Sequence, residues 1–429
     1  MQTLSVSLIN VFLASIFQIG IIYKIGVGLD SDIYYSAILV SNIFYTVIFG
    51  PLNNVLIPMF LGKANGKPDA GLFWNTLILV IGIGFISMGM IYLPFLILYP
   101  LIFKSISAGN IYNIGKIFLV YSTYNIFFSA LCVKNCFLIA SGRPLFGQFN
   151  ILLGWLISLS LLFVVDPTEN LHKIAGCLLV GSIGGLFVPN FKAGHIQFKM
   201  KNFISDTKKL MERTKSLIFG GSVFKTELLF DGAIASFCGM GSLTIFYFLQ
   251  RMMSLITNVV NSGYIQPITI KLSDLALGTN LMFLKKELKK SSFRALLISF
   301  GFFGLIMVLL KILGYFKIEF FNPYVNIFEE NLVIFLLLIG YLFGSIFCKV
   351  YATGFYVLKK EFIFLKISTT AFIFGVFFKI LGAYFFKLSG LSLGTSMYWV
   401  LYSCFLFVSF LSLLENKNPN SVNMVAKKI

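Results

Sequence analysis

Charged residues are scarce in this chain of 429 residues, and acidic residues are scarcer than basic ones. Aspartate and glutamate together number 16, histidine only 2 and tryptophan 3, and charged residues make up 12% of the chain. A soluble protein of this length needs many more polar side chains to cover its surface. The composition therefore excludes an ordinary soluble domain.

Motifs for chemistry are missing as well. The sequence contains no serine elbow, HExxH metal motif, P-loop or paired catalytic carboxylates. The six cysteines lie in or beside apolar segments, and no neighbouring side chains complete a metal-ligand set. We therefore expect that the protein is not an enzyme and holds no metal or organic cofactor.

The chain is instead rich in long apolar runs. Hydrophobic residues make up 58% of it, and a helix of about twenty apolar residues spans the hydrocarbon layer of a membrane. The runs between charged or Gly/Pro/Asn breaks predict an all-α polytopic membrane protein with about twelve transmembrane helices. The predicted spans are 4–23, 33–61, 72–98, 112–140, 145–165, 171–191, 217–240, 243–270, 293–315, 331–357, 362–386 and 390–414.

The net charge of +18 is distributed unevenly among the loops. Lysine and arginine concentrate in loops after even-numbered spans, above all 192–215 and 271–294, whereas loops after odd-numbered spans hold most of the acids. Loops rich in lysine and arginine stay in the cytoplasm. We therefore predict a multi-pass protein of the bacterial inner (cytoplasmic) membrane with both termini cytoplasmic, and no nucleic-acid partner.

An internal repeat is indicated by matched glycine pairs. Gly26 and Gly28 follow span one, and Gly239 and Gly241 follow span seven. Two parallel repeats of this kind form two six-helix pseudo-repeat lobes around a central cavity, an arrangement that suits alternating access. The predicted segments are an N-terminal lobe at 1–200, a basic cytoplasmic linker at 201–216, a C-terminal lobe at 217–416 and a cytoplasmic tail at 417–429.

Ionisable side chains within the spans are the main candidates for function, because charge at membrane depth is costly. Glu227 and Asp231 are four residues apart and share a helix face. Lys225 precedes them, and Arg251 lies in the next span. Such a cluster either joins helices or lines a watery cavity; both remain open for Lys225 and Glu227, and function is favoured for Arg251 and Asp231. Three other lysines are explained by snorkelling near span ends: Lys134, Lys349 and Lys379.

Two stretches resemble a known family. The segment from Gly26 to Ala37, with its close at Val55–Phe60, resembles the motif of the MurJ/MviN lipid II flippases, with Asp32, Asn42 and Pro58 at the motif's places. The segments at 228–237 and 246–253 resemble that family's seventh and eighth helices. The family belongs to the multidrug/oligosaccharidyl-lipid/polysaccharide exporter superfamily.

The resemblance implies a flippase that moves a polyprenyl-diphosphate-linked sugar precursor, lipid II-like, across the membrane in cell-wall peptidoglycan biogenesis. Arg251 matches an arginine that faces the family's cavity. The implied substrate-binding residues are Arg251, Lys225, Lys24 and Asn42, and the implied ion-coupling or gating residues are Asp32, Glu227 and Asp231. Coupling to membrane potential, H⁺ or Na⁺ is expected. The expected partners are the lipid-linked sugar, membrane lipids and cell-envelope synthesis proteins, and the expected state is a monomer.

The chain departs from the family at several positions. Val11 and Phe17 stand where the first family helix carries arginines, Tyr45 and Thr46 replace an arginine pair, and the chain has about twelve spans rather than fourteen. Three alternatives therefore stay open. They are a flippase for O-antigen or capsule repeat units, a cation-coupled drug antiporter with Glu227 and Asp231 as coupling acids, and a transport-inactive scaffold of a cell-envelope complex.

Overall fold

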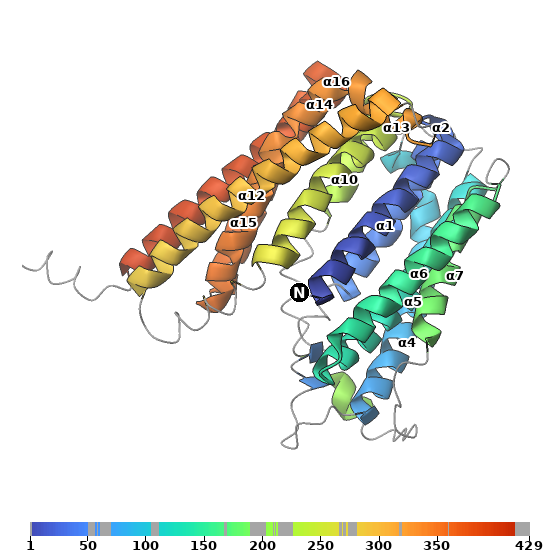
Figure 1. Ribbon diagram of the computed structural model, residues 1–429, viewed down its shortest axis with the longest axis horizontal. Helices are drawn as coiled ribbons and strands as arrows, with labels where there is room; N and C mark the ends of the chain where they lie inside the picture. Colours follow the sequence, from blue (N-terminus) through green and yellow to red (C-terminus); the bar gives the residue numbers. More distant parts are fainter. Residues whose placement is uncertain are drawn as a thin grey trace, which may run out of the picture. The chain divides into compact units, whose positions relative to one another are not determined.

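Helices are the only regular secondary structure among the residues that the computed structural model describes (Figure 1). These residues are 2–49, 56–57, 59–60, 70–103, 111–166, 170–188, 203–208, 210, 212, 226–265, 268, 272, 281–316, 320–358 and 360–416. Each of the predicted spans overlaps a described helix, and the prediction of an all-helical membrane protein is confirmed.

Eight of the described helices are long and apolar enough to cross a membrane. Seven of them are α1 (Gln2–Ile25), α4 (Ala70–Ile102), α5 (Ile111–Ala140), α6 (Pro144–Val164), α10 (Ser242–Val260), α12 (Leu281–Phe316) and α16 (Glu361–Asn416), and the eighth, Leu332–Phe355, joins α14 (Leu332–Leu337) to α15 (Ile339–Val357). Helix α16 is two helices in one, because Phe386 and Lys387 leave helical geometry, and Lys387 has a φ of 50°. The break falls between the last two predicted spans.

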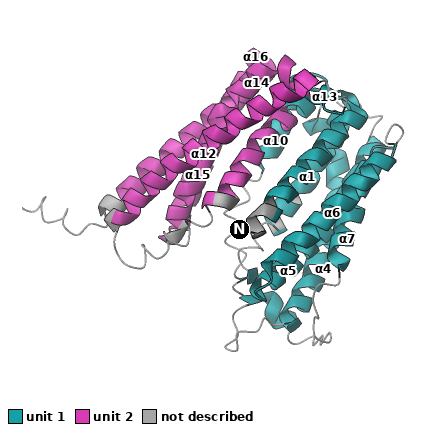
Figure 2. Cartoon of the chain, viewed as in Figure 1, with its two compact units in different colours: residues 1–245, 319–324 teal, residues 246–318, 325–429 magenta. Residues whose placement is uncertain are grey.

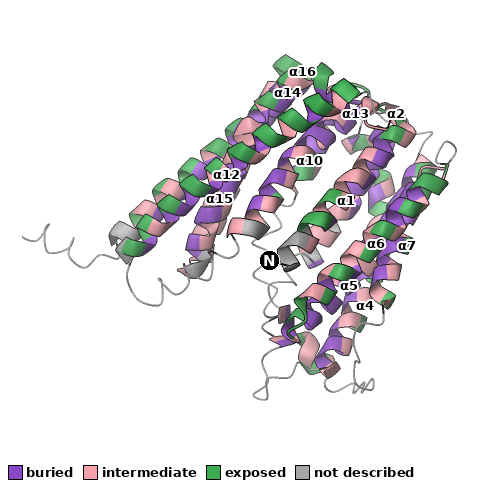
Figure 3. Cartoon of the chain, in the orientation of Figure 1, coloured by how far each residue is buried: buried purple, intermediate pink, exposed green. Residues whose placement is uncertain are grey.

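The outward faces of the helices are apolar. In α4, five exposed side chains recur at intervals of three and four residues and so form one stripe along the helix. They are Ile86, Met90, Leu93, Ile97 and Leu101, each between 62% and 73% exposed. Exposed residues line α12 in the same way (Figure 3). Such stripes are stable against lipid rather than water.

The chain forms two compact units (Figure 2). Unit 1 comprises Met1–Ile245 and Glu319–Tyr324, and unit 2 comprises Phe246–Ile318 and Val325–Ile429. Unit 1 thus includes α9 (Glu227–Phe237) and the first residues of α10. The lobes predicted from the sequence, and the cavity between them, stay predictions, because the units group segments by packing and do not define repeats.

Helix α5 is the central helix of unit 1. It packs against α2 (Leu29–Phe44), α4, α6 and α7 (His172–Phe187), while α1 packs on α6. Small residues allow α6 and α7 to approach closely. A Cβ atom at Gly181 would overlap the Gly154 carbonyl oxygen, so both positions need glycine or backbone movement.

Lys134 of α5 holds the end of α7. Its side chain is 2% exposed, and its Nζ donates to the carbonyl oxygens of Leu186 and Val188, each at 2.8 Å, and of Gly185 at 3.4 Å. Helix α7 has 16 residues, or about 24 Å, which is shorter than the hydrocarbon layer of about 30 Å. The lysine therefore pairs carbonyl groups that a short helix leaves without intrahelical partners.

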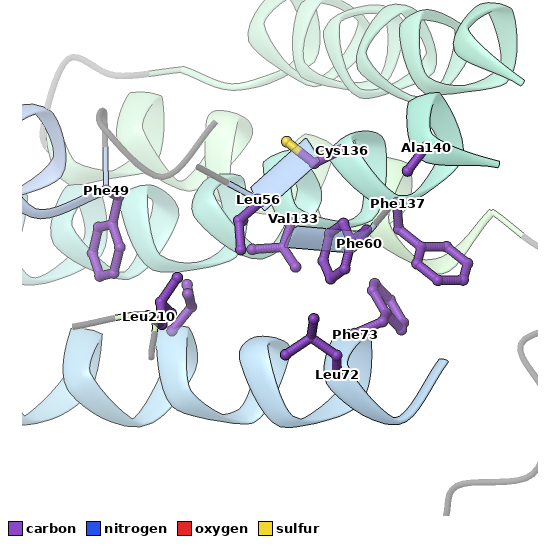
Figure 4. Close-up of a cluster of buried hydrophobic side chains, with 11 residues drawn as sticks. Phe49, Leu56, Phe60, Leu72, Phe73, Val133, Cys136, Phe137, Ala140 and Leu210 are labelled. Carbon is purple, nitrogen blue, oxygen red and sulfur yellow. The ribbon is translucent and has the colours of Figure 1, made fainter. Parts of the chain in front are cut away.

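The linker between the predicted lobes also packs on unit 1. Leu210 belongs to a cluster of buried apolar side chains that includes Leu56, Phe60, Phe73 and Phe137 (Figure 4). A few residues earlier in the linker, the Asp206 Oδ2 atom accepts a hydrogen bond of 2.9 Å from the side chain of buried Asn75. This part of the linker is thus attached to unit 1 by apolar and polar contacts.

Unit 2 is built around α15 and α16. Helix α15 packs against both α16 and α12, and α14 (Leu332–Leu337) packs on α16. The Ser396 hydroxyl donates to the Leu337 carbonyl and accepts from the Tyr341 amide. Lys379, buried to 2% exposure, places its ammonium 4.7 Å from the centre of the Tyr398 ring, a favourable position for a desolvated cation.

Candidate functional site

Asp32 is the centre of a hydrogen-bonded cluster within unit 1. It lies in the first turn of α2 and is 2% exposed. Its Oδ2 accepts the Gly241 amide at 2.7 Å, and its Oδ1 accepts the amide and the hydroxyl of Thr244 at 2.9 and 2.7 Å. These amides belong to the start of α10, where the helix dipole favours negative charge. Asp32 therefore caps a helix that begins more than 200 residues later.

The two glycine pairs meet beside this carboxylate. Gly241 has a φ of +80°, and a Cβ atom there would lie 3.0 Å from the Val27 side chain and 3.8 Å from the Gly28 amide nitrogen. Only glycine adopts that φ without strain. The two turns that the sequence marks as a repeat therefore contact each other.

Ser31 and Thr244 extend the correspondence, since each stands three residues after the second glycine of its pair. The Thr244 hydroxyl lies 2.9 Å from the Ser31 hydroxyl, and Ser31 in turn accepts the Gly28 amide at 2.9 Å. In the predicted repeat, equivalent residues that contact each other would lie near the pseudo-symmetry axis. We name the set formed by Ser31, Asp32, Gly241 and Thr244 the Asp32 clamp.

Glu227 and Asp231 lie one turn apart in α9, as their spacing predicts. They are 5% and 1% exposed. Helix α9 packs against α2, and Gly232 contacts Leu39 there. Two buried carboxyl groups on a helix that packs against the helix of Asp32 concentrate acidic side chains in one part of unit 1.

The two described cations among the predicted substrate-binding residues lie in different settings. Lys24 is half-buried at the end of α1, and its Nζ donates to the carbonyl oxygens of Phe163 at 3.4 Å and Val165 at 3.2 Å, where α6 ends. Arg251 lies near the middle of α10, in unit 2, and its side chain is exposed. The structure therefore gives Lys24 a helix-capping contact and leaves the Arg251 side chain accessible.

The structure says less about the other two predicted substrate-binding residues, Asn42 and Lys225. Asn42 is half-buried near the end of α2, where Thr46 and the π-helix η1 (Tyr45–Phe49) follow. Its carbonyl oxygen accepts the Thr46 hydroxyl at 2.8 Å. Lys225 lies outside the described residues. In the described part of the chain, no group of three histidine, cysteine or acidic side chains is placed to hold a metal ion.

Sequence reasoning missed the partners of Asp32. Thr244 is an ordinary residue at the start of a helix, and a backbone amide such as that of Gly241 has no sequence signature. The matched positions of Gly28 and Gly241 are the only available signal, since they predict that equivalent residues lie near the same axis.

Comparison with solved structures identifies the fold of this chain. The sequence matches no known protein-family profile and no curated protein. Among solved structures, an inward-facing multidrug resistance MATE family transporter of the MOP superfamily is 15% identical, with 97% of this chain and 96% of that chain covered and a TM-score of 0.72. The lipid II flippase MurJ in an inward closed conformation is 16% identical, with 94% and 86% covered and a TM-score of 0.70.

This chain has the fold shared by MATE and MurJ transporters. A further MATE structure, in complex with MaD3S, is 14% identical over 96% of both chains with a TM-score of 0.65. The match runs over nearly the whole chain, so the MATE/MurJ fold accounts for both units. The similarity to MATE and MurJ structures is nearly equal, and it does not distinguish a drug from a lipid-linked sugar.

Proposed function

We propose that the protein is an alternating-access exporter that flips a polyprenyl-diphosphate-linked sugar precursor, lipid II-like, across the bacterial inner membrane. The observation that carries this proposal is Arg251, an exposed arginine near the middle of an apolar helix. Charged side chains in membrane helices face bundle interiors or water-filled cavities and mark the pathway of a substrate. The MATE/MurJ fold supports the same reading.

The charge of Arg251 favours an anionic substrate. An arginine side chain binds phosphate oxygens through two parallel hydrogen bonds, which gives both energy and orientation. A cationic drug would be repelled by the same group. Among the exporters of this fold, a substrate with a diphosphate therefore fits Arg251 better than a cation does, and lipid II-like precursors and capsule repeat units share that chemistry.

The Asp32 clamp supports a role in gating. It ties the start of α2 to the start of α10, that is, a span of the first predicted repeat to a span of the second. With cytoplasmic termini, both helix starts lie at the extracytoplasmic surface. Opening to that side requires the clamp to break, and closing re-forms three hydrogen bonds to one carboxylate. Asp32 is thus the gating residue in this proposal.

A second candidate function is a cation-coupled drug antiporter. The observation in its favour is the pair of buried acids, Glu227 and Asp231, in α9. Buried carboxylates in membrane helices are suited to bind and release a proton or Na⁺. Under this proposal Glu227→Gln and Asp231→Asn abolish transport, and Arg251→Gln does not.

The test is complementation of cells that are depleted of the protein, with externally accessible lipid II as the measured quantity. Cells receive the wild type, Arg251→Ala, or Arg294→Ala, which removes an exposed arginine of α12 and serves as the control. We expect lipid II to stay at the inner leaflet with Arg251→Ala and to be flipped normally with the wild type and the control.

Three other results would change the assignment. Normal lipid II flipping with loss of a surface polysaccharide would move the substrate to a capsule or O-antigen repeat unit. Normal flipping of both lipids, with loss of proton- or Na⁺-linked drug efflux, would contradict the flippase proposal and favour the antiporter. Loss of none of these would favour a transport-inactive scaffold.

A further inference from the structure

The two helices of α16 pack closely near the turn that joins them. A Cβ atom at Gly382 would overlap the backbone of Gly390, and one at Gly394 would lie 2.8 Å from the Cα of Lys379. These glycines allow the helices to touch backbone to backbone. The close contact therefore has a cause in the sequence, and it is confined to the region around the turn.

Farther from the turn, the two helices pack through larger side chains, because the segments 361–374 and 397–416 contain no glycine. The hydrogen bond of 2.9 Å between the hydroxyls of Ser368 and Tyr402 is a polar link at this level. Beside it lies a groove of ≈ 560 Å³, lined by residues of both helices, a size typical of sites for small ligands.

The groove has a cationic polar part and an apolar part. Lys366 and Thr370 line it from the first helix, and Cys404, Phe405 and Val408 line it from the second. All five of these side chains are exposed. The Lys366 ammonium also lies 5.0 Å from the centre of the Phe362 ring. A ligand that fits therefore has an anionic group next to an apolar chain.

The depth of Lys366 matches that of a lipid headgroup. It lies five residues after Glu361, the first residue of α16, which is about 8 Å along a helix. A lysine at this depth extends its ammonium to the phosphate level while its methylene groups stay in the apolar layer. By the loop charges, this is the cytoplasmic leaflet, where a lysine near the surface adds about 1 kcal/mol to the attraction of anionic lipid.

We propose that this groove binds an anionic phospholipid of the cytoplasmic leaflet, with the phosphate at the Lys366 ammonium and an acyl chain along Phe405 and Val408. The groove shares no lining residue with Arg251 or the Asp32 clamp, and the proposal does not depend on which substrate is transported. A lipid bound there covers side chains that are otherwise exposed, among them Lys366, Cys404 and Phe405.

The chain carries a natural reporter for this site. Of its six cysteines, Cys404 alone is exposed; the others are buried or half-buried. The full-length protein in detergent is labelled with N-ethylmaleimide, and the rate at Cys404 is read by peptide mass spectrometry. The probes are dioctanoyl phosphatidylglycerol, dioctanoyl phosphatidylcholine and farnesyl diphosphate at equal concentrations.

We expect phosphatidylglycerol to slow labelling about fivefold relative to phosphatidylcholine, the factor that corresponds to one lysine. Lys366→Gln removes the difference, Lys366→Arg retains it, and Lys290→Gln, which changes an exposed lysine of α12, also retains it. Equal protection by both phospholipids, or unchanged protection in Lys366→Gln, would overturn the proposal. So would protection by farnesyl diphosphate alone, which would assign the groove to a prenyl-linked substrate.

Discussion

Lys134 in unit 1 and Arg251 in unit 2 are both cationic side chains on apolar helices, and their surroundings differ. Lys134 is buried, and its ammonium donates to the carbonyl oxygens of Gly185, Leu186 and Val188 at the end of α7. Arg251 is exposed. A cation that pairs with a helix end stabilises the fold and has little capacity left for a ligand, whereas an exposed cation contributes little to stability and is available to an anion.

The largest effect on stability is expected for Asp32→Ala in unit 1. The change removes a buried carboxylate that accepts three hydrogen bonds and leaves the Gly241 and Thr244 amides unpaired. We expect a loss of about 3 to 5 kcal/mol in the free energy of unfolding, measured by denaturation in micelles. Asp30→Ala is the control, because Asp30 lies in the same turn and is exposed. A similar loss in both variants would show that the hydrogen bonds of the Asp32 clamp do not contribute to the free energy of unfolding.

A smaller loss is expected for Lys134→Met, which keeps the volume of the side chain but removes the donor to α7. Unpaired carbonyl groups at Leu186 and Val188 cost about 2 to 4 kcal/mol in total. The same denaturation experiment measures it, with Lys116→Met on the same helix as the control, since Lys116 is half-buried and lies over the Tyr112 ring. If both lysines cost the same, the carbonyl contacts are not what Lys134 contributes.

Lys24→Ala separates the two roles that have been assigned to this residue. As a cap on the end of α6, the partly exposed Lys24 contributes about 0.5 to 1 kcal/mol. We expect that small change in unfolding and normal substrate flipping. Loss of flipping in a variant of normal stability would instead support the substrate-binding role predicted from the sequence.

The smallest effect on stability is expected for Arg251→Gln. An exposed side chain away from caps and core contacts changes the free energy of unfolding by less than about 0.5 kcal/mol. Transport should nevertheless fall about tenfold or more, because a charge-assisted bond to the diphosphate is lost. A marked loss of stability would show that Arg251, like Lys134, stabilises the fold, and the two cations would then not differ in role.

Much of the fold could be predicted from the sequence because a membrane imposes one strong rule. Apolar runs of sufficient length must be helices, since no water is present to pair exposed backbone groups. The break in α16 followed from the gap between the runs at 362–386 and 390–414. The docking of Leu210 did not follow, because a basic linker carries no pattern that shows which apolar cluster a single leucine joins.

The candidate site could be predicted only in part. Arg251 stood out because ionisable groups in apolar segments are rare, and Asp32 because it lies at a place of the motif that resembles the MurJ/MviN family. The snorkelling predicted for Lys134 was replaced by contacts with the end of α7, since the length of that helix relative to the membrane depends on tertiary packing. The partners of Asp32 are mainly backbone amides, which every residue except proline possesses, so no sequence pattern identifies them.

The length of α12 has a mechanical consequence. It is one continuous helix of 36 residues, about 54 Å long, against a hydrocarbon layer of about 30 Å. Its first turns, with Lys285, Lys286, Lys289 and Lys290, therefore project into water as a rigid arm. A displacement of that arm would be transmitted along the helix into the membrane. An antibody fragment bound to the lysine-rich end would therefore restrain α12 and the helices α15 and α16 that pack against it.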